Sequence, residues 1–509
     1  MIQSKPASSL TTPQVVRPVS TTKLEKPSLW IWVPYVWLFF TSTRALSNWL
    51  AGGRPQGGNV AIDASGSPVD RVLMTLLIVL GLYVLGKRGT RTKRILAQNK
   101  WVVVLFIYIA LSIIWSNFPG ISLRRGIRSI GTLLMVLVVL TERNPFGAVR
   151  ALFRRLYVVH IPLSIVAIKY FRNIGVWYNW SGSEEEWTGL CTDKNSLGQV
   201  AMCSGLFSVW QILQDWPTKK QKQSFKKLAP NVLLLLLSLW LLRGSRNVHS
   251  STAIVGFVVC FVALIGLQYV KKRSVHAKRV ILRWSMSFAL LAPLVYGAFQ
   301  MFDTTPVKIV LDATGRNMTL TDRNLIWADV INDAAKSPVL GVGFGAFWVG
   351  PIGYEMYPMP NWSRKTPEWR PEEAHNGFVD VYVQLGAVGE MLLLIVIGVA
   401  FSGALTHLES DFQFGSLRLT LLLSVIISNM TETSFLDGTH GLWFLFLLAA
   451  INLPSVGRGD SRKGAASIKE TCSSSVDTSS MNMFFRHPNL CTSPTIQLVC
   501  SESSVIRSA

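Results

Sequence analysis

Charged residues and cysteines are scarce in this 509-residue chain. Only 15% of its residues are Asp, Glu, Lys or Arg, whereas soluble domains carry roughly 25%, and half of its residues are hydrophobic. This composition argues against a soluble multidomain enzyme and excludes collagen, a coiled coil and wholesale disorder. The six cysteines lack zinc-type spacing, and three of them fall in a Ser-rich C-terminal part. They therefore indicate neither a disulfide framework nor a metal site.

Acidic residues are the rarer charged class, because 28 Asp and Glu stand against 50 Lys and Arg, which gives a net charge of +22. In a membrane protein, Lys and Arg first serve to hold loops in the cytoplasm, so the excess does not require a nucleic-acid partner and we expect none. Eighteen Trp and 25 Phe suit a chain with many membrane interfaces. We expect an all-α, polytopic membrane helix bundle.

Apolar runs predict about 12 transmembrane helices within residues 29–454, since a span needs about 20 mostly apolar residues. The predicted spans lie near residues 29–50, 70–86, 101–116, 129–141, 156–171, 196–213, 230–243, 252–270, 280–300, 377–404, 417–430 and 440–454. Several are short for this length and would be tilted, broken or merged. Residues 1–28 predict a polar cytoplasmic segment, and the Ser-rich residues 455–509 predict a disordered cytoplasmic tail.

Dense basic clusters fall on alternate loops, around residues 87–94, 150–155, 219–227 and 271–279. The positive-inside rule assigns these loops to the cytoplasm, so both termini are expected there. The longest loop on the opposite side, residues 301–375, is too long for a plain connector. We expect this large external loop to contain short helices.

One of these helices is predicted over residues 324–335, where apolar side chains recur on one helical face. It would lie at the membrane surface with Arg323 in its first turn. The glycine-rich residues 341–345 lack the flanking residues of a nucleotide loop. They favour a tight turn that lets backbone approach a ligand or another helix.

Arginine outnumbers lysine on the predicted external side. A guanidinium group binds phosphate through two parallel hydrogen bonds, whereas an ammonium is a point charge, so these arginines suggest a phosphate-bearing ligand. The alternative is that they form ion pairs with external carboxylates. His375 directly precedes a predicted span and suits general-base chemistry; the alternative is a structural or helix-capping histidine.

Two motifs point to a family. Leu320-Thr-Asp-Arg-Asn-Leu-Ile-Trp327 resembles a Gly-Arg…Ile-Trp motif, and the segment from His375 to Gly389 resembles a His-Asn…Leu-Gly signature. Further similar segments are 43–49, 115–125, 187–198, 337–348 and 429–434. Together, over residues 29–454, they resemble the O-antigen ligase and polysaccharide polymerase family, closest to exopolysaccharide-production polymerases of the succinoglycan type.

This chain departs from the family pattern at three places. Asp193 stands where the branch often has His, and Asp322 stands where Gly is usual. Residues 250–252 read Ser-Ser-Thr and lack an expected basic residue, which Arg243 or Arg246 would replace. The last departure bears on one phosphate contact.

The resemblance implies a membrane glycosyltransferase of the bacterial cytoplasmic (inner) membrane with its active site facing the periplasm. It would polymerise or ligate polyprenyl-pyrophosphate-linked oligosaccharide repeat units, with a saccharide hydroxyl as acceptor and polyprenyl pyrophosphate as leaving group. The implied partners are this donor, the acceptor, the bilayer, and a flippase and chain-length or export proteins. No cofactor is expected, and no Asp-x-Asp pair in an external loop suggests an essential metal.

Within this chemistry, Arg323 is expected to stabilise the pyrophosphate and His375 to accept the acceptor proton. Glu372, Glu373 and Glu432 are substitutes for the second role. The expected substrate-binding residues are Arg243, Arg246, Arg124, Arg125, Lys194, Asn195, Asn376 and Glu432.

Two alternatives remain at this point. A polytopic transporter or flippase of a lipid-linked saccharide would also have about 12 spans, although it would need charges at mid-membrane depth and an internal repeat. Within the family, the sequence does not separate a polymerase from a ligase.

Overall fold

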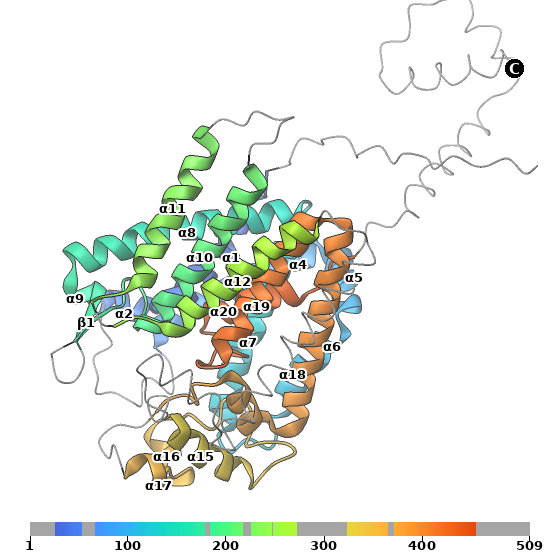
Figure 1. The fold of residues 1–509 in the computed structure, drawn as a ribbon. Coiled ribbons are helices and arrows are strands. Elements are labelled where there is room, and N and C mark those ends of the chain that lie inside the picture. Colours follow the sequence, from blue (N-terminus) through green and yellow to red (C-terminus); the bar gives the residue numbers. More distant parts are fainter. Residues whose placement is uncertain are drawn as a thin grey trace, which may run out of the picture. The chain divides into compact units, whose positions relative to one another are not determined.

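The computed structural model describes residues 26–52, 67–178, 184–216, 225–246, 248–271, 323–364 and 371–454. This part of the chain is mostly helical (Figure 1), which confirms the predicted helical class. Its strands β1 (Val176–Tyr178) and β2 (Glu185–Trp187) pair antiparallel, with Val176 opposite Trp187. Most of the predicted N-terminal segment, the first part of the 301–375 loop and the predicted tail lie outside the described residues.

Local sequence signals set where many helices begin. Pro68, Pro119 and Pro145 occupy first positions, where a missing N–H costs nothing. Asp193 and Asn376 cap helix starts by accepting backbone N–H groups. The helices are η1 (Leu29–Ile31), α1 (Trp32–Ser42), α2 (Leu46–Leu50), α4 (Pro68–Lys87), α5 (Gly89–Gln98), α6 (Lys100–Leu111), α7 (Pro119–Leu140), α8 (Pro145–Tyr170), α9 (Arg172–Gly175), α10 (Lys194–Asp215), α11 (Phe225–Arg243), α12 (Ser251–Val270), α15 (Arg323–Ala334), α16 (Pro351–Met356), α17 (Pro360–Ser363), α18 (Gly377–Ser410), α19 (Phe412–Asn429) and α20 (Gly441–Ala450).

Six of the described helices are long and apolar enough to cross a membrane: α4, α8, α10, α12, α18 and α19. The pair α5 and α6, bent by 91°, would add a seventh. Helices α1, α11 and α20 are apolar but shorter, and α7 carries three arginines in its first turns. The predicted span at 280–300 lies outside the described residues, so the count of about 12 spans stays a prediction.

Exposed apolar faces fit a lipid environment. On α4, Val72, Leu76 and Val79 recur at helical spacing and are exposed, while Leu77 and Val84 on the opposite side are buried. Helix α4 packs against α7, and α10, α19 and α20 contribute much of the buried core. An exposed stripe of this kind would be unfavourable in water, so it indicates the side that faces lipid.

Helix α18 breaks at Gly386, whose φ of 64° is outside the helical region. The glycine-rich segment fills the break, because Val342 N donates to Val383 O at 3.1 Å and Ala387 N donates to Pro338 O at 2.9 Å. A Cβ added at Gly341 would lie 2.4 Å from the α18 backbone. The prediction of a tight turn that allows close backbone approach is therefore confirmed.

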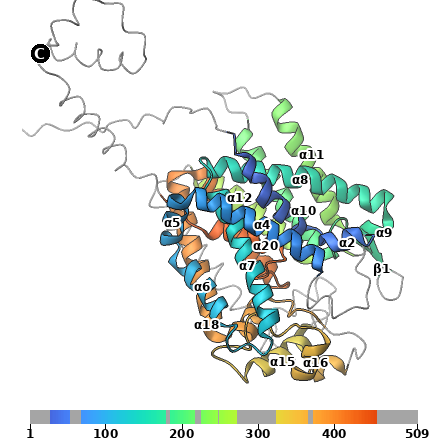
Figure 2. The same cartoon turned by 180° about the vertical axis from the view of Figure 1, so that it is seen from behind.

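The two ends of this helix pack have different chemistry. Figures 1 and 2 both place α15 and α16 beyond the end of the bundle where α18 begins, and α5 beside the other end. Helix α5 is amphipathic and exposes Arg91, Lys93 and Arg94. The candidate catalytic residues thus lie at the end opposite to this basic helix.

Candidate active site

Glu432 accepts hydrogen bonds from the side chains of two helices. It lies in the turn after α19, and its side chain is 9% exposed. Its Oε1 accepts from Arg323 Nη2 at 2.8 Å and from Asn195 Nδ2 at 2.9 Å. Arg323 begins α15 and Asn195 lies in the first turn of α10. Residues more than 100 positions apart in the chain thus meet on one carboxylate.

His375 completes this group, which we call the Glu432 cluster (Asn195, Arg323, Glu373, His375 and Glu432). Its Nδ1 lies 2.6 Å from Glu373 Oε1 and 3.5 Å from Glu432 Oε2. The predicted catalytic pair, Arg323 and His375, therefore contacts the same carboxylate. Sequence reasoning named Glu373 only as a substitute, because its distance from Nδ1 depends on how the loop folds.

The backbone of His375 has a φ of 49°, in the left-handed region that non-glycine residues rarely adopt. The next residue begins the helix. Asn376 Oδ1 accepts from Phe378 N at 3.0 Å and from Val379 N at 3.3 Å, which caps α18. His375 therefore lies in the turn directly before the cap, with its imidazole beside Glu432.

Burial and charge shift two pKa values in this cluster. Burial raises the pKa of Glu373 to about 7, although contact with His375 opposes the shift. Burial lowers the pKa of His375, but contacts with Glu373 and Glu432 outweigh this effect and raise it to about 9. At neutral pH the imidazole therefore holds a proton, which weakens the prediction that His375 itself accepts one.

Arg323 is tied to the surrounding backbone. Its Nη1 donates to Thr431 O, and Thr431 Oγ1 lies 2.5 Å from Thr252 Oγ1 at the start of α12. Trp327 Nε1 donates to Ala374 O at 2.8 Å, which fastens α15 to the residue before His375. The helix predicted over 324–335 is confirmed, and these contacts explain how it positions Arg323.

Other predicted site residues lie elsewhere. Lys194 Nζ lies 2.7 Å from Glu186 Oε1 on β2, and the side-chain oxygen of Asn376 caps α18. Arg243 ends α11 and Arg246 follows it, and both are exposed. Among the described residues, neither contacts the Glu432 cluster. Their predicted roles in substrate binding remain predictions.

The arginines of α7 border a separate cavity of about 340 Å³, which we call the α7 cavity. Arg125 is held by backbone, since Nη1 donates to Gly345 O at 2.9 Å and Nη2 to Trp348 O at 2.7 Å. The charged residues that line the cavity are Arg124, Arg125, Arg128, Glu372, Glu373, Asp380 and Asp437. Because Glu373 lines it, the cavity adjoins the Glu432 cluster.

Sequence reasoning missed two carboxylates of this cavity. Asp380 is 4% exposed, and it accepts from Trp348 Nε1 and, at 2.6 Å, from Gln384 Nε2. The available signal was that Asp380 is one of two carboxylates in the predicted span after His375, the other being Glu390. Asp437 lies in the short turn before α20, where nothing in the sequence marks it.

Glu373, His375 and Glu432 offer ligand atoms that lie within 4.8 Å of one another, a spacing that suits a metal ion. One feature opposes a cation, because the Arg323 guanidinium already binds Glu432. The arrangement suits proton transfer and anion binding better than metal binding.

The sequence of this chain is similar to that of known proteins. Residues 232–408 match the family model described as O-Antigen ligase, a segment that contains Arg323, Glu373 and His375 but not Asn195 or Glu432. The chain is 25% identical over 330 residues to the exopolysaccharide production protein ExoQ of Rhizobium meliloti (strain 1021), covering 62% of this chain and 67% of that protein. The predicted resemblance to the O-antigen ligase and polysaccharide polymerase family is thereby confirmed, with the family match lying over residues 232–408 of this chain.

Proposed function

We propose that this chain is a membrane glycosyltransferase that polymerises or ligates polyprenyl-pyrophosphate-linked oligosaccharide repeat units. The match to the O-antigen ligase family model and the similarity to ExoQ, an exopolysaccharide production protein, support this class of reaction. The observation that carries the proposal is the Glu432 cluster, in which one carboxylate holds both a guanidinium and an imidazole. A cation stabilises the departing pyrophosphate, and a proton-transfer group beside it takes the proton that the acceptor hydroxyl loses.

The reaction breaks the bond between the anomeric carbon of the donor sugar and a pyrophosphate oxygen. An acceptor hydroxyl oxygen forms the new bond and loses its proton, and polyprenyl pyrophosphate leaves with the electron pair. A guanidinium has five N–H donors, and among the described residues Arg323 uses two of them, on Thr431 and Glu432. We assign its remaining donors to the leaving pyrophosphate.

We assign proton acceptance to Glu373 and revise the role of His375. A base works best when its pKa lies near the operating pH, and the pKa of Glu373 is about 7. Protonated His375 then holds Glu373 in place and adds a positive charge near the leaving group. Both residues remain catalytic in this scheme.

The α7 cavity is suited to the acceptor saccharide. Its carboxylates accept hydrogen bonds from sugar hydroxyls, its arginines donate them, and Trp348, Tyr354 and Phe435 offer aromatic faces. Four carboxylates against three arginines make it a poor site for a pyrophosphate. We therefore reassign Arg124 and Arg125 from the pyrophosphate to the acceptor.

We place the site at the periplasmic face of a bacterial cytoplasmic membrane, with both termini in the cytoplasm and about 12 spans. The separation between the Glu432 cluster and the basic helix α5 supports this orientation. A flippase that delivers donor, and chain-length or export proteins, are the partners this chemistry needs. We expect no metal requirement, for the reasons given above.

Lipid-carrier analysis in a strain lacking the gene tests the proposal. Single repeat units on the carrier are expected for a polymerase, and finished polymer on the carrier for a ligase. A transporter would instead leave donor on the cytoplasmic leaflet, and the purified protein would move intact donor without releasing polyprenyl pyrophosphate. That result would reject the enzyme assignment.

A further inference from the structure

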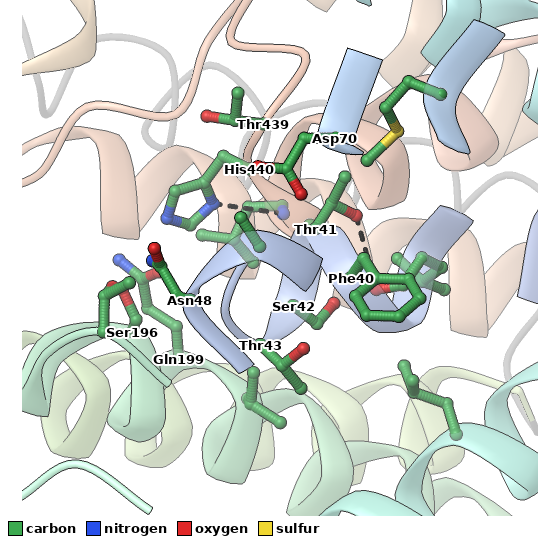
Figure 3. A pocket seen from close by; sticks show the side chains of 18 of the residues that line it. Phe40, Thr41, Ser42, Thr43, Asn48, Asp70, Ser196, Gln199, Thr439 and His440 are labelled. Atoms are coloured by element: carbon green, nitrogen blue, oxygen red, sulfur yellow. Dashed lines mark hydrogen bonds between the residues drawn. The ribbon is translucent and has the colours of Figure 1, made fainter. Parts of the chain in front are cut away.

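A second cavity, of about 520 Å³, borders the α7 cavity, and Figure 3 shows it from close by. We call it the α10 cavity. The two share Arg128 and Thr439 in their linings. The α10 cavity is also bordered by the end of α1 and the starts of α4, α10 and α20. Its volume lies in the roughly 300–1,000 Å³ range of small-molecule sites.

The lining of the α10 cavity is amphipathic. Hydroxyl, amide, carboxylate and imidazole groups come from Asn48, Asp70, Ser196, Gln199 and His440, which Figure 3 labels. Leucine, methionine and valine side chains of α1, α4, α8, α10 and α20 supply apolar surface. A sugar ring has the same division, with hydroxyls at its rim and C–H groups on its faces.

Gln199 points to a ligand that is not part of the protein. The residue is 2% exposed, yet its Oε1 has no hydrogen-bond partner among the described residues. A buried acceptor without a partner is unfavourable unless something else satisfies it. Ser196 lies one turn earlier on the same face of α10, so both present polar groups to the α10 cavity.

The charges of the α10 cavity favour an uncharged ligand. Asp70 accepts from Ser47 N at 3.0 Å and from Ser47 Oγ at 2.5 Å, and its carboxylate opposes the single guanidinium of Arg128. His440 Nδ1 accepts from Leu442 N at 3.3 Å, so the neutral ring carries its proton on Nε2. A phosphate would meet a carboxylate here, whereas a hydroxyl can donate to it.

We propose that the α10 cavity is a second saccharide subsite, which holds an uncharged sugar residue of the acceptor next to the one in the α7 cavity. Gln199 hydrogen bonds to a hydroxyl of this sugar. The inference rests on the proposed function, since it extends the same acceptor site. It implies that the protein recognises at least two sugar residues of the acceptor.

The test measures binding of a repeat-unit oligosaccharide, released from the cell's own polymer by partial hydrolysis, to the purified full-length chain. Gln199→Leu removes the amide and keeps an apolar side chain of similar size. Gln211→Leu is the matched control, because Gln211 also lies on α10, is 1% exposed and has an unpartnered Oε1, but lies outside the cavity. Asn48→Ala, at a half-buried position of the lining, serves as a second variant.

Gln199→Leu and Asn48→Ala are each expected to raise the Kd by about three- to tenfold, the loss of one hydrogen bond. Gln211→Leu should bind like the wild type. Equal Kd values for the two glutamine variants would overturn the subsite. It would also be overturned if Gln199→Leu weakened the binding of a polyprenyl phosphate and left the binding of the oligosaccharide unchanged. Turnover by His375→Ala tests the proposed function separately. A failure of the subsite can therefore be distinguished from a failure of the proposed function.

Discussion

One arginine lies at each end of helix α19, and the two have different roles. Arg418 belongs to the helix itself, and Arg323, which begins α15, contacts the turn that follows it. Arg418, in its second turn, is 1% exposed. Its Nε donates to Ala449 O and its Nη2 to Asn452 Oδ1, both at 2.8 Å, and the guanidinium also contacts Ala450 O and His407. These contacts satisfy carbonyls at the end of α20, which have no partner within their own helix.

Within the part of the chain that the structure describes, Arg323 contacts the turn at the other end of α19 with two of its five donors. Its partner Glu432 also contacts His375, and Glu373, the other partner of His375, lines the α7 cavity. The comparison teaches that a buried arginine alone does not mark a site. An arginine with a chemical role differs from a structural one in having guanidinium N–H donors that bind no protein group and lie beside an ionisable side chain. Each prediction below tests that distinction.

The largest effect is expected from Glu373→Gln, which removes the proposed base and should lower turnover by about 10²–10⁴-fold. In the wild type, activity should rise with pH around 7, as Glu373 ionises, and fall around 9, as His375 loses its proton. A pH–rate profile with the purified protein checks both limbs. If His375 were the base, activity would only rise as pH passes about 9.

Arg323→Ala should lower turnover by about 10²–10³-fold, the effect of removing one preorganised donor group from a developing anion. Arg323→Lys should fail as well, because a point charge replaces a planar fork. His375→Ala should also lose polymer. Polymer yield per folded protein in the membrane measures all three, and normal polymer from both alanine variants would refute these assignments.

Arg418→Leu should act on stability. Each α20 carbonyl left buried without a partner costs about 1–3 kcal/mol, so the purified variant should unfold at lower temperature. The turnover of the protein that remains folded should match the wild type. Loss of turnover at unchanged thermal stability would contradict the contrast between the two arginines.

The smallest effect is expected from Asn376→Ala, which removes the cap of α18 and costs about 1 kcal/mol. Turnover should fall partly, because His375 would be held less firmly. Asn376→Asp, which also caps helices well, should restore both stability and turnover. If Asn376→Asp is stable yet inactive, the amide would instead contact substrate, as the sequence first suggested.

Some of this site could be predicted from sequence and some could not. Helical periodicity located α15 to within a residue, and the start of the apolar run placed His375 at the mouth of α18. Lys194 and Asn376 were singled out by motif, but the nearest partners of their side chains are local.

The long-range features depend on packing. Glu373 reaches His375 only in the folded turn before α18, and the break in α18 exists only because the glycine segment folds against Gly386. The unpartnered oxygen of Gln199 and the position of Arg128 in the linings of both cavities likewise appear only once the helices are assembled. No local pattern in the sequence encodes them.

The most direct test of the central claim measures release of polyprenyl pyrophosphate from a purified lipid-linked repeat unit, in a single turnover, by the wild type, Arg323→Lys and Arg418→Leu. The account predicts release by the wild type and by folded Arg418→Leu, and almost none by Arg323→Lys. Release by Arg323→Lys at the wild-type rate would contradict the claim that its guanidinium receives the departing pyrophosphate.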